Sequence, residues 1–166
     1  MLIRPWTKSD VSSLVLHGNN KGIFDNMTDA FPYPYTEKNA IEFIEMVSKS
    51  NPPSILAIEV NGVACGGIGI HPGSGIYRKN AELGYWLGES LWNQGIVSKC
   101  IPKMVHYGFS NWDIDRIYAR PFGRNLASQK VLEKNNFTLE TRLNGTLIKN
   151  EQIEDELIYA IRRDQM

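Results

Sequence analysis

The sequence has no excess of charge of either sign. Eighteen lysines and arginines balance eighteen aspartates and glutamates, so the formal net charge is zero at pH 7. Because no acidic or basic block stands out, nucleic acid and membrane surfaces are poor candidate partners. A long apolar run is also lacking, and the N-terminal MLIRPWTKSD does not contain the apolar segment of a signal peptide. We therefore expect a cytoplasmic protein.

Cysteine is scarce as well, since the chain contains only Cys65 and Cys100. They have no CxxC spacing and no nearby histidines, so the sequence predicts no metal site and two reduced, partly buried thiols. Two nucleotide-binding motifs are missing too. The chain has neither the lysine and following hydroxyl of GxxxxGK[ST] nor the three glycines of GxGxxG. A nucleoside triphosphate or a dinucleotide is therefore disfavoured as a ligand.

What the chain does contain is an alternation of strand-like and helix-like segments. Its 166 residues, 42% of them hydrophobic, suffice for one core, and we expect a single domain over residues 1–166. Two β-rich runs flank Asn61-Gly62, a dipeptide typical of tight hairpin turns, and AELGYWLG (81–88) predicts a third strand beside them. Further strands are expected at 1–5, 116–120, 137–143 and 156–162, and helices after Ser9-Asp10, after Thr36, from near Ile96 and over 125–135.

This order of segments predicts a mixed α/β fold. The hairpins make the sheet antiparallel, whereas a helix that crosses between Leu83 and Ile117 makes those two strands parallel. The crossing begins with WNQGIV, residues 92–97, between the end of a strand and the start of a helix. The first N–H groups of a helix have no intrahelical acceptor and bind phosphate oxygens readily. This loop is therefore a candidate anion site, and a plain turn in which Gly95 supplies backbone freedom is the alternative.

Three blocks in order resemble the GNAT superfamily of N-acetyltransferases, and within it the ribosomal-protein N-terminal acetyltransferase-like branch. They are AELGYWLGESLWNQGIVSKCI, RIYARPFGRNLASQKVLEKNNFTLE and LIYAIRR. The resemblance implies a twisted, mainly antiparallel sheet with two splayed central parallel strands flanked by helices, and acetyl-CoA as cosubstrate in the gap between them. It also implies transfer of an acetyl group to a primary amine, for example the N-terminal α-amino group of a protein.

The resemblance assigns the cosubstrate site residue by residue. WNQGIV matches the Q/R-x-x-G-x-G/A loop that holds the CoA pyrophosphate, although Trp92 replaces its first polar residue and Val97 stands where smaller residues are common. Asn125 matches the asparagine of N-x-x-S/A that contacts the pantetheine arm, and a helix N-cap is its alternative role. The residues implied to bind acetyl-CoA are Trp86, Leu87, Gly88, Gln94, Gly95, Ile96, Val97, Ser98, Asn125 and Ser128.

The leaving thiolate needs a hydrogen-bond donor. Many family members place a tyrosine seven residues after the matched asparagine to protonate it, but this chain has Leu132 there. The resemblance makes the hydroxyl of Ser128 the substitute donor. Because a hydroxyl is a weak acid and a thiol has a pKa of ~8.5, we expect Ser128 to stabilise the thiolate by a hydrogen bond more than to deliver a proton.

The acceptor amine must lose a proton, and Glu82 is the candidate base. Family members often carry a carboxylate on this strand, and alternation places Glu82 on one face with Gly84 and Trp86. A carboxylate on a central strand is costly to bury without a partner, which favours a functional role. A solvent-exposed ion pair with Arg78-Lys79 is the alternative. His71 is a second candidate base.

The sequence gives the least information about the site that binds the acceptor amine. In the family, the segment that corresponds to FPYPYT (31–36) helps to wall this site, but the same residues can equally pack under the sheet. The residues implied to contact the acceptor are Phe31, Tyr33, Tyr35, His71 and Tyr77. A small-molecule amine is an alternative acceptor, and a catalytically silent acyl-CoA-binding module is an alternative to an enzyme. Both a monomer and a homodimer are compatible with the sequence, and His17 and His106 receive no role.

Overall fold

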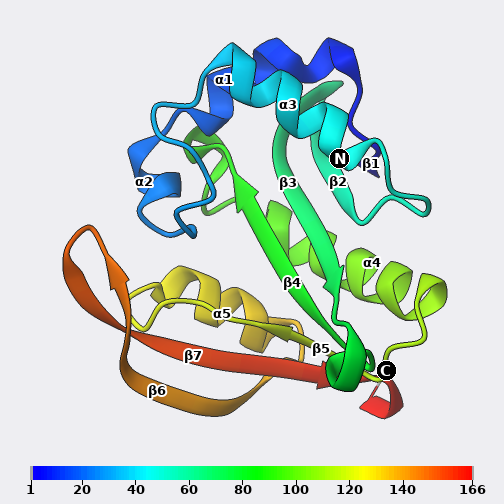
Figure 1. Ribbon diagram of the computed structural model, residues 1–166, viewed down its shortest axis with the longest axis vertical. Helices are drawn as coiled ribbons and strands as arrows, with labels where there is room; N and C mark the ends of the chain where they lie inside the picture. Colours follow the sequence, from blue (N-terminus) through cyan, green and yellow to red (C-terminus); the bar gives the residue numbers. More distant parts are fainter. Residues whose placement is uncertain (1, 166) are drawn as a thin grey trace. The chain divides into compact units, whose positions relative to one another are not determined.

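A computed structural model describes residues 2–165 (Figure 1). Its strands form one seven-stranded sheet in the order β1-β2-β3-β4-β5-β7-β6. The β4–β5 pair is parallel, and the pairs β1–β2, β2–β3, β5–β7 and β6–β7 are antiparallel. The strands are β1 (Leu2–Arg4), β2 (Ile55–Val60), β3 (Val63–Pro72), β4 (Asn80–Leu87), β5 (Arg116–Ala119), β6 (Thr138–Lys149) and β7 (Gln152–Arg162).

The helices complete the mixed α/β fold that the sequence predicts, and the predicted fold class is confirmed. They are α1 (Val11–Gly18), α2 (Lys21–Phe24), α3 (Glu37–Val47), α4 (Ile96–Asn111) and α5 (Leu126–Lys134), with short 3-10 turns η1 (Lys8–Asp10), η2 (Gly75–Tyr77), η3 (Glu89–Leu91) and η4 (Arg163–Gln165). Helix α4 forms the crossing between the parallel strands. The ladder between these strands covers only Asn80–Glu82 and Arg116–Tyr118, after which β4 continues to Leu87.

Contacts within the chain divide it into two compact units. Unit 1 comprises the residues up to Gly69 and Tyr85–Cys100, and unit 2 comprises Ile70–Gly84 and the residues from Ile101 onward. Strands β3 and β4 and helix α4 contribute residues to both units. The expectation of a single domain over residues 1–166 stays a prediction.

In unit 1, helices α1 and α3 pack against each other and cover a core next to β2 and β3 (Figure 1). Thr36 caps helix α3 as predicted, because the Thr36 hydroxyl accepts a hydrogen bond from the Asn39 amide while the Asn39 side chain accepts one from the Thr36 amide. The core contains the buried residues Trp6, Leu14, Tyr35, Ala40, Ile44, Val47, Ala57 and Ala64.

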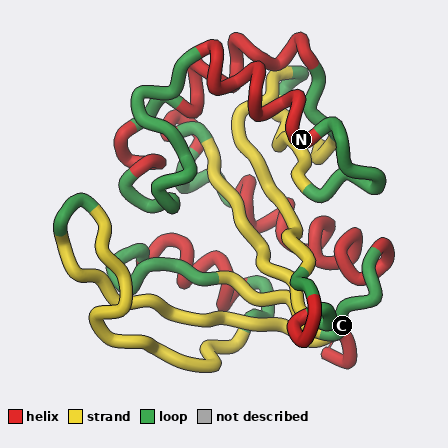
Figure 2. The backbone as a smooth tube through the Cα atoms, in the orientation of Figure 1, coloured by secondary structure: helices red, strands yellow, loops and turns green. Residues whose placement is uncertain are grey.

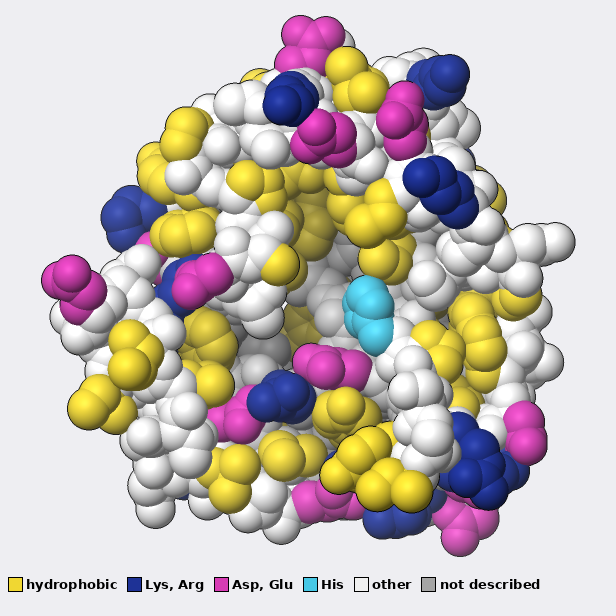
Figure 3. Space-filling model, viewed as in Figure 1, with side chains coloured by type: hydrophobic (Ala, Val, Ile, Leu, Met, Phe, Trp, Pro, Cys, Tyr) yellow, Lys and Arg dark blue, Asp and Glu magenta, His cyan; other side chains and the backbone are white. Residues whose placement is uncertain are grey.

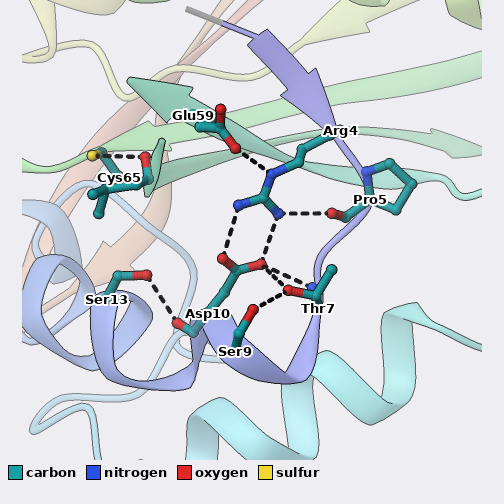
Figure 4. A network of polar contacts seen from close by, with 9 residues as sticks. Arg4, Pro5, Thr7, Ser9, Asp10, Ser13, Glu59 and Cys65 are labelled. Atoms are coloured by element: carbon teal, nitrogen blue, oxygen red, sulfur yellow. Dashed lines mark hydrogen bonds and ion pairs between the residues drawn. The ribbon is translucent and has the colours of Figure 1, made fainter. Parts of the chain in front are cut away.

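A polar network ties β1 to η1 and β2 in the same unit (Figure 4). The guanidinium of Arg4 donates hydrogen bonds to both carboxylate oxygens of Asp10, at 2.7 and 2.8 Å, and its Nε donates to Glu59. The backbone and hydroxyl of Thr7 also donate to Asp10, each at 2.9 Å. These hydrogen bonds hold the pKa of the buried Asp10 below its ordinary value, and the hydrogen bond from Arg4 has the largest effect.

In unit 2, alternation on β5 and β7 separates a buried face from a polar one. Ile117, Ala119, Tyr159 and Ile161 are buried, whereas Arg116 and Arg162 lie on the other face. Helix α5 contributes Leu132, which is fully buried, and the Tyr159 hydroxyl donates a 2.8 Å hydrogen bond to Glu133. This face is the core of the second unit.

The last hairpin is longer than the sequence predicts. Strands β6 and β7 extend to a turn at Asn150-Glu151, where both residues have positive φ, instead of ending near 143 and beginning near 156 (Figure 2). The added segment has exposed residues on both faces, so its apolar alternation is weak. Cross-strand polar contacts hold it instead, since Asp155 accepts hydrogen bonds from Arg142 and from the Gly145 amide.

Candidate active site

The predicted strand–loop–helix junction is present in unit 1. Strand β4 ends at Leu87, one residue before the predicted end at Gly88, and α4 begins at Ile96, as the sequence predicts. Asn93 and Gly95 both have left-handed backbones, with φ values of 61° and 70°. The Gly95 carbonyl accepts the helical hydrogen bond of Lys99 at 3.2 Å, so Gly95 lies at the start of the helix. A Cβ added to Gly95 would meet no atom within 4 Å, and the loop is therefore open above this residue.

Side-chain hydrogen bonds to backbone carbonyls close this loop on itself. The indole N–H of Trp92 donates to the Leu87 carbonyl at 2.7 Å, and the Gln94 amide donates to the Ser90 carbonyl at 3.2 Å. Trp92 thus has a local structural contact although it replaces a polar residue of the family loop. Val97, the second residue of α4, is half-buried.

Strand β3 approaches β4 very closely beside the predicted CoA-binding residues of β4. A Cβ on Gly66 would lie 2.4 Å from the Trp86 carbonyl oxygen, and one on Gly67 would lie 2.8 Å from the Trp86 indole nitrogen. The Gly88 amide donates to the Cys65 carbonyl at 2.8 Å. Because real Cβ atoms do not approach other atoms this closely, the two adjacent glycines are required by the position of Trp86.

The aromatic residues of FPYPYT divide between the core and the surface of unit 1. Phe31 packs against Tyr35 and Trp86, with ring centroids 5.2 and 5.7 Å apart, and Tyr33 stacks on Phe24 at 5.5 Å. Tyr35 is buried, which raises its pKa to about 12, whereas Tyr33 is 46% exposed. Of the three aromatics predicted to wall the acceptor site, Tyr33 is accessible and Tyr35 packs under the sheet.

Unit 2 brings Glu82 and His71 to one face of neighbouring strands. A Cβ on Gly84 would lie 3.7 Å from Nε2 of His71, so the imidazole lies within van der Waals range of the position above Gly84 on this face. Burial lowers the pKa of His71, and the charge of Glu82 raises it in part. The carboxylate therefore acts electrostatically on this ring, and the two candidate bases belong to one cluster.

Tyr118 is a member of this cluster that the sequence did not reveal. It is the direct ladder partner of Glu82 on β5, and paired residues of neighbouring strands lie on the same face. Burial raises the pKa of its phenol, and the charge of Glu82 adds to the shift. The guanidinium of Arg116 lies 4.7 Å from the centroid of the Tyr118 ring. The alternation of RIYAR indicated the face of Tyr118, but not its register with Glu82.

The ion pair that the sequence offered as an alternative for Glu82 is not formed. Lys79 pairs with Asp113 at 2.6 Å, and Arg78 donates to the Gly75 carbonyl at 3.1 Å. Among residues 2–165, Glu82 has no hydrogen-bond or ion-pair partner, although it is half-buried. A half-buried carboxylate without a partner keeps its oxygens available to accept hydrogen bonds from a substrate or from water.

Asn125 is the N-cap of helix α5, whose first residue is Leu126. The Asn125 side-chain oxygen accepts a hydrogen bond from the Ser128 amide at 3.1 Å, so the N-cap role is confirmed. Both residues are half-buried. Leu132, at the position where the family tyrosine is missing, is fully buried in the core of unit 2.

Tyr77, the remaining predicted residue, lies in η2 and is 67% exposed. Within residues 2–165, no interaction joins it to the cluster around Glu82. No group of three or more His, Cys, Asp or Glu side chains within residues 2–165 is arranged to hold a metal ion. In the same range, no helix has the length and apolar character of a membrane span. Acidic and basic side chains are interspersed over the face in Figure 3.

Comparisons with known proteins agree with the geometry. The model of the "Acetyltransferase (GNAT) domain" family matches residues 1–138. The chain is 36% identical over 96 residues to "Uncharacterized N-acetyltransferase YoaA" of Bacillus subtilis (strain 168), which covers 58% of this chain and 54% of that protein. It is 33% identical over 83 residues to "Ribosomal-protein-serine acetyltransferase" of Escherichia coli (strain K12), covering 50% and 46%. The chain thus spans about half the length of these two curated relatives.

A solved structure extends the similarity over nearly the whole chain. RimL, described as a ribosomal L7/L12 alpha-N-protein acetyltransferase in complex with coenzyme A, superposes with a TM-score of 0.84 at 25% identity. The superposition covers 99% of this chain and 94% of RimL. Two of the proteins to which the chain is similar are thus named as ribosomal-protein acetyltransferases. The family model, which matches well over half of the sequence, shows that the chain belongs to the GNAT acetyltransferase family.

Proposed function

We propose that this chain is a single-domain, cytoplasmic N-acetyltransferase that transfers the acetyl group of acetyl-CoA to a primary amine, with the N-terminal α-amino group of a protein as the acceptor. The observation that carries the proposal is the loop that enters α4. It combines two left-handed residues, Asn93 and Gly95, with open space above Gly95 and the N-terminus of a sixteen-residue helix. Such a junction suits the phosphate oxygens of CoA.

The cosubstrate is bound mainly through the backbone. The amides of Gly95, Ile96 and Val97 meet the pyrophosphate, with Gln94 and Ser98 at its edges, and a Cβ on Gly95 would disturb the left-handed turn that presents them. The strand residues Trp86 and Leu87 offer backbone groups to the pantetheine arm and the thioester oxygen, and Gly88, whose amide donates to the Cys65 carbonyl, contacts the arm beside them. Asn125 donates its side-chain N–H₂ to the same arm while its oxygen caps α5.

The chemistry begins at the amine, which attacks only as the neutral species. Glu82 accepts the proton through a water molecule, and His71 and Tyr118 shape the polar face on which the carboxylate lies. The nitrogen then forms a bond to the thioester carbonyl carbon, and the resulting tetrahedral oxyanion collapses as the carbon–sulfur bond breaks. CoA departs as a thiolate, to which Ser128 donates a hydrogen bond. The nitrogen then releases its remaining extra proton through water to the thiolate, which leaves the neutral amide and the thiol of CoA.

The acceptor contacts Phe31, Tyr33 and Tyr77, while the buried Tyr35 supports Phe31 from the core. An exposed aromatic at Tyr33 provides a surface for the residues that follow an N-terminal amine. The name of RimL, a protein acetyltransferase of similar fold, supports a protein acceptor. A small-molecule amine is the alternative.

The test follows free thiol during incubation with acetyl-CoA and a panel of acceptors. The panel contains peptides with free N-termini, the same peptides with blocked N-termini, lysine-containing peptides, polyamines and amino sugars. Thiol release only with free N-termini supports the proposal. Release only with small amines would replace the acceptor class, and CoA binding without turnover for any acceptor would identify a silent acyl-CoA-binding module.

A further inference from the structure

We propose that Asn20 and Glu89 are positioning residues that hold the CoA-binding loop in its binding conformation. The inference rests on the proposed function, because it concerns the same loop. The two residues lie in unit 1, in segments that are distant in the sequence. We call residues 17–22, where α1 passes into α2, the α1–α2 corner, and residues 88–94, which follow β4, the β4–α4 loop.

Asn20 uses both ends of its side chain. Its Oδ1 accepts a hydrogen bond from the Ile23 amide at 3.0 Å, which caps α2, and its Nδ2 donates to Oε2 of Glu89 at 2.6 Å. Glu89 is the second residue of the β4–α4 loop and opens the 3-10 turn η3. A charge-assisted hydrogen bond therefore joins the corner to the loop directly.

Two further contacts support the same loop from the same corner. The would-be Cβ of Gly22 lies 3.2 Å from Cη2 of Trp92, so the indole rests on the backbone of Gly22. The would-be Cβ of Gly88 lies 2.5 Å from Nδ1 of His17, so the imidazole packs against the Gly88 backbone. His17, to which the sequence assigned no role, thereby supports the start of the loop.

These contacts reach the loop at its first residue, at Glu89 and at Trp92. The part that follows, Asn93 to Gly95, has two left-handed residues and presents its amides at the helix start. Fixing the backbone of a loop costs conformational entropy, and contacts that order the loop before its ligand arrives remove that cost from binding. The α1–α2 corner therefore preorganises the loop. The Asn20–Glu89 hydrogen bond is the contact suited to a test, because substitutions can exchange its donor and its acceptor.

The experiment measures the dissociation constant of CoA by titration calorimetry for the full chain. In Asn20→Asp, the carboxylate still accepts the Ile23 hydrogen bond and caps α2, but it places a negative charge against Glu89. We expect CoA to bind about tenfold more weakly, a coupling of ordinary size between two sites. Asn39→Asp is the matched control, because it makes the same change at a half-buried residue of α3 whose side-chain oxygen accepts from Thr36. Its CoA affinity should equal that of the wild type.

The double variant N20D/E89Q reverses the hydrogen bond, since the new amide donates to the new carboxylate. It should restore wild-type CoA affinity to within about twofold, and E89Q alone should have a small effect because its amide oxygen still accepts from Asn20. Rescue by reversal is not expected if N20D only weakens α2. Equal affinity of N20D and wild type, or a double variant as weak as N20D, would overturn the inference. Failure of the wild-type chain to bind CoA would instead refute the proposed function.

Discussion

The Arg4–Asp10–Glu59 network allows a quantitative test of what holds unit 1 together (Figure 4). The perturbation is Asp10→Asn, which keeps the shape of the side chain but removes its charge. Asp10 accepts two hydrogen bonds from Arg4 and two from Thr7, and its side chain is only 8% exposed. In the variant, one amide N–H₂ would face the guanidinium donors, and Arg4 would keep only Glu59 as a charged partner.

The expected loss of stability follows from these contacts. A hydrogen bond to a charged group contributes about 1.5–3 kcal/mol, and breaking a buried ion pair costs about 3–5 kcal/mol. Arg4 is 22% exposed and retains Glu59, so the lower part of this range applies, and we expect about 2–3 kcal/mol. For a chain of this size, that loss lowers the melting temperature by about 4–12 °C.

Urea denaturation at several pH values checks both the size and the electrostatic origin of the effect. The pKa of Asp10 is lowered in the folded state from 3.8, mainly by the Arg4 hydrogen bond. The carboxylate therefore contributes its stability above pH ~4 and loses it as the pH falls through the lowered folded value. The difference between wild type and variant should be full at pH 7 and shrink in acid.

The exposed Lys38–Glu42 pair on α3 provides the control for Asp10→Asn. Its atoms are 3.8 Å apart and the two side chains are 82% and 60% exposed, so Glu42→Gln should cost no more than about 0.5 kcal/mol. If Asp10→Asn costs no more than this control at pH 7, or if its effect is independent of pH, the network does not stabilise the unit in the way described here.

Three further predictions concern the candidate site. Gly95→Asp should abolish measurable CoA binding in calorimetry, whereas Gly95→Ala should weaken it less, because alanine brings the strain of a positive φ without the charge; equal affinities for both variants and wild type would exclude the loop. Asn125→Ser should preserve the α5 cap and the melting temperature while it weakens CoA binding, whereas Asn125→Ala should also cost about 1 kcal/mol of stability; unchanged CoA affinity in both would leave only the cap. Glu82→Gln should lower the acetylation rate by about 10²- to 10⁴-fold below the pKa of the acceptor amine and recover in part above it, and NMR titration should show a lower pKa for His71, since the charge of Glu82 raises it; a wild-type rate profile would remove Glu82 from the mechanism.

The sequence predicted best where a few neighbouring residues determine the backbone. Asn61 and Gly62 have φ values of 51° and 82°, as the tight hairpin between β2 and β3 requires. Thr36 and Asn125 cap their helices through residues three positions later, and such local hydrogen bonds can be recognised from spacing alone. The crossing helix followed from the same kind of local signal at Gly95.

Sequence patterns did not predict the features that depend on residues far apart in the chain. The length of β6 and β7 is set by polar contacts such as Arg142 with Asp155, which hydrophobic alternation does not report. The pairing of Tyr118 with Glu82 depends on the register of two strands separated by α4. The role of Asn20 depends on Glu89, far along the chain. Sequence patterns located the candidate base and the loop, but not the residues that surround them.

Gly66 and Gly67 show why this limit is physical. By propensity alone, two glycines weaken a strand, and they carry no side chain from which a pattern could be recognised. In the structure they are required, because the carbonyl and the indole of Trp86 occupy the space that two Cβ atoms would need. Trp86 in turn packs on Phe31, which connects β4 to the aromatic segment before α3. A residue type that is unfavourable for the strand by itself is thus selected by a tryptophan about twenty positions later, and only the packed structure relates the two.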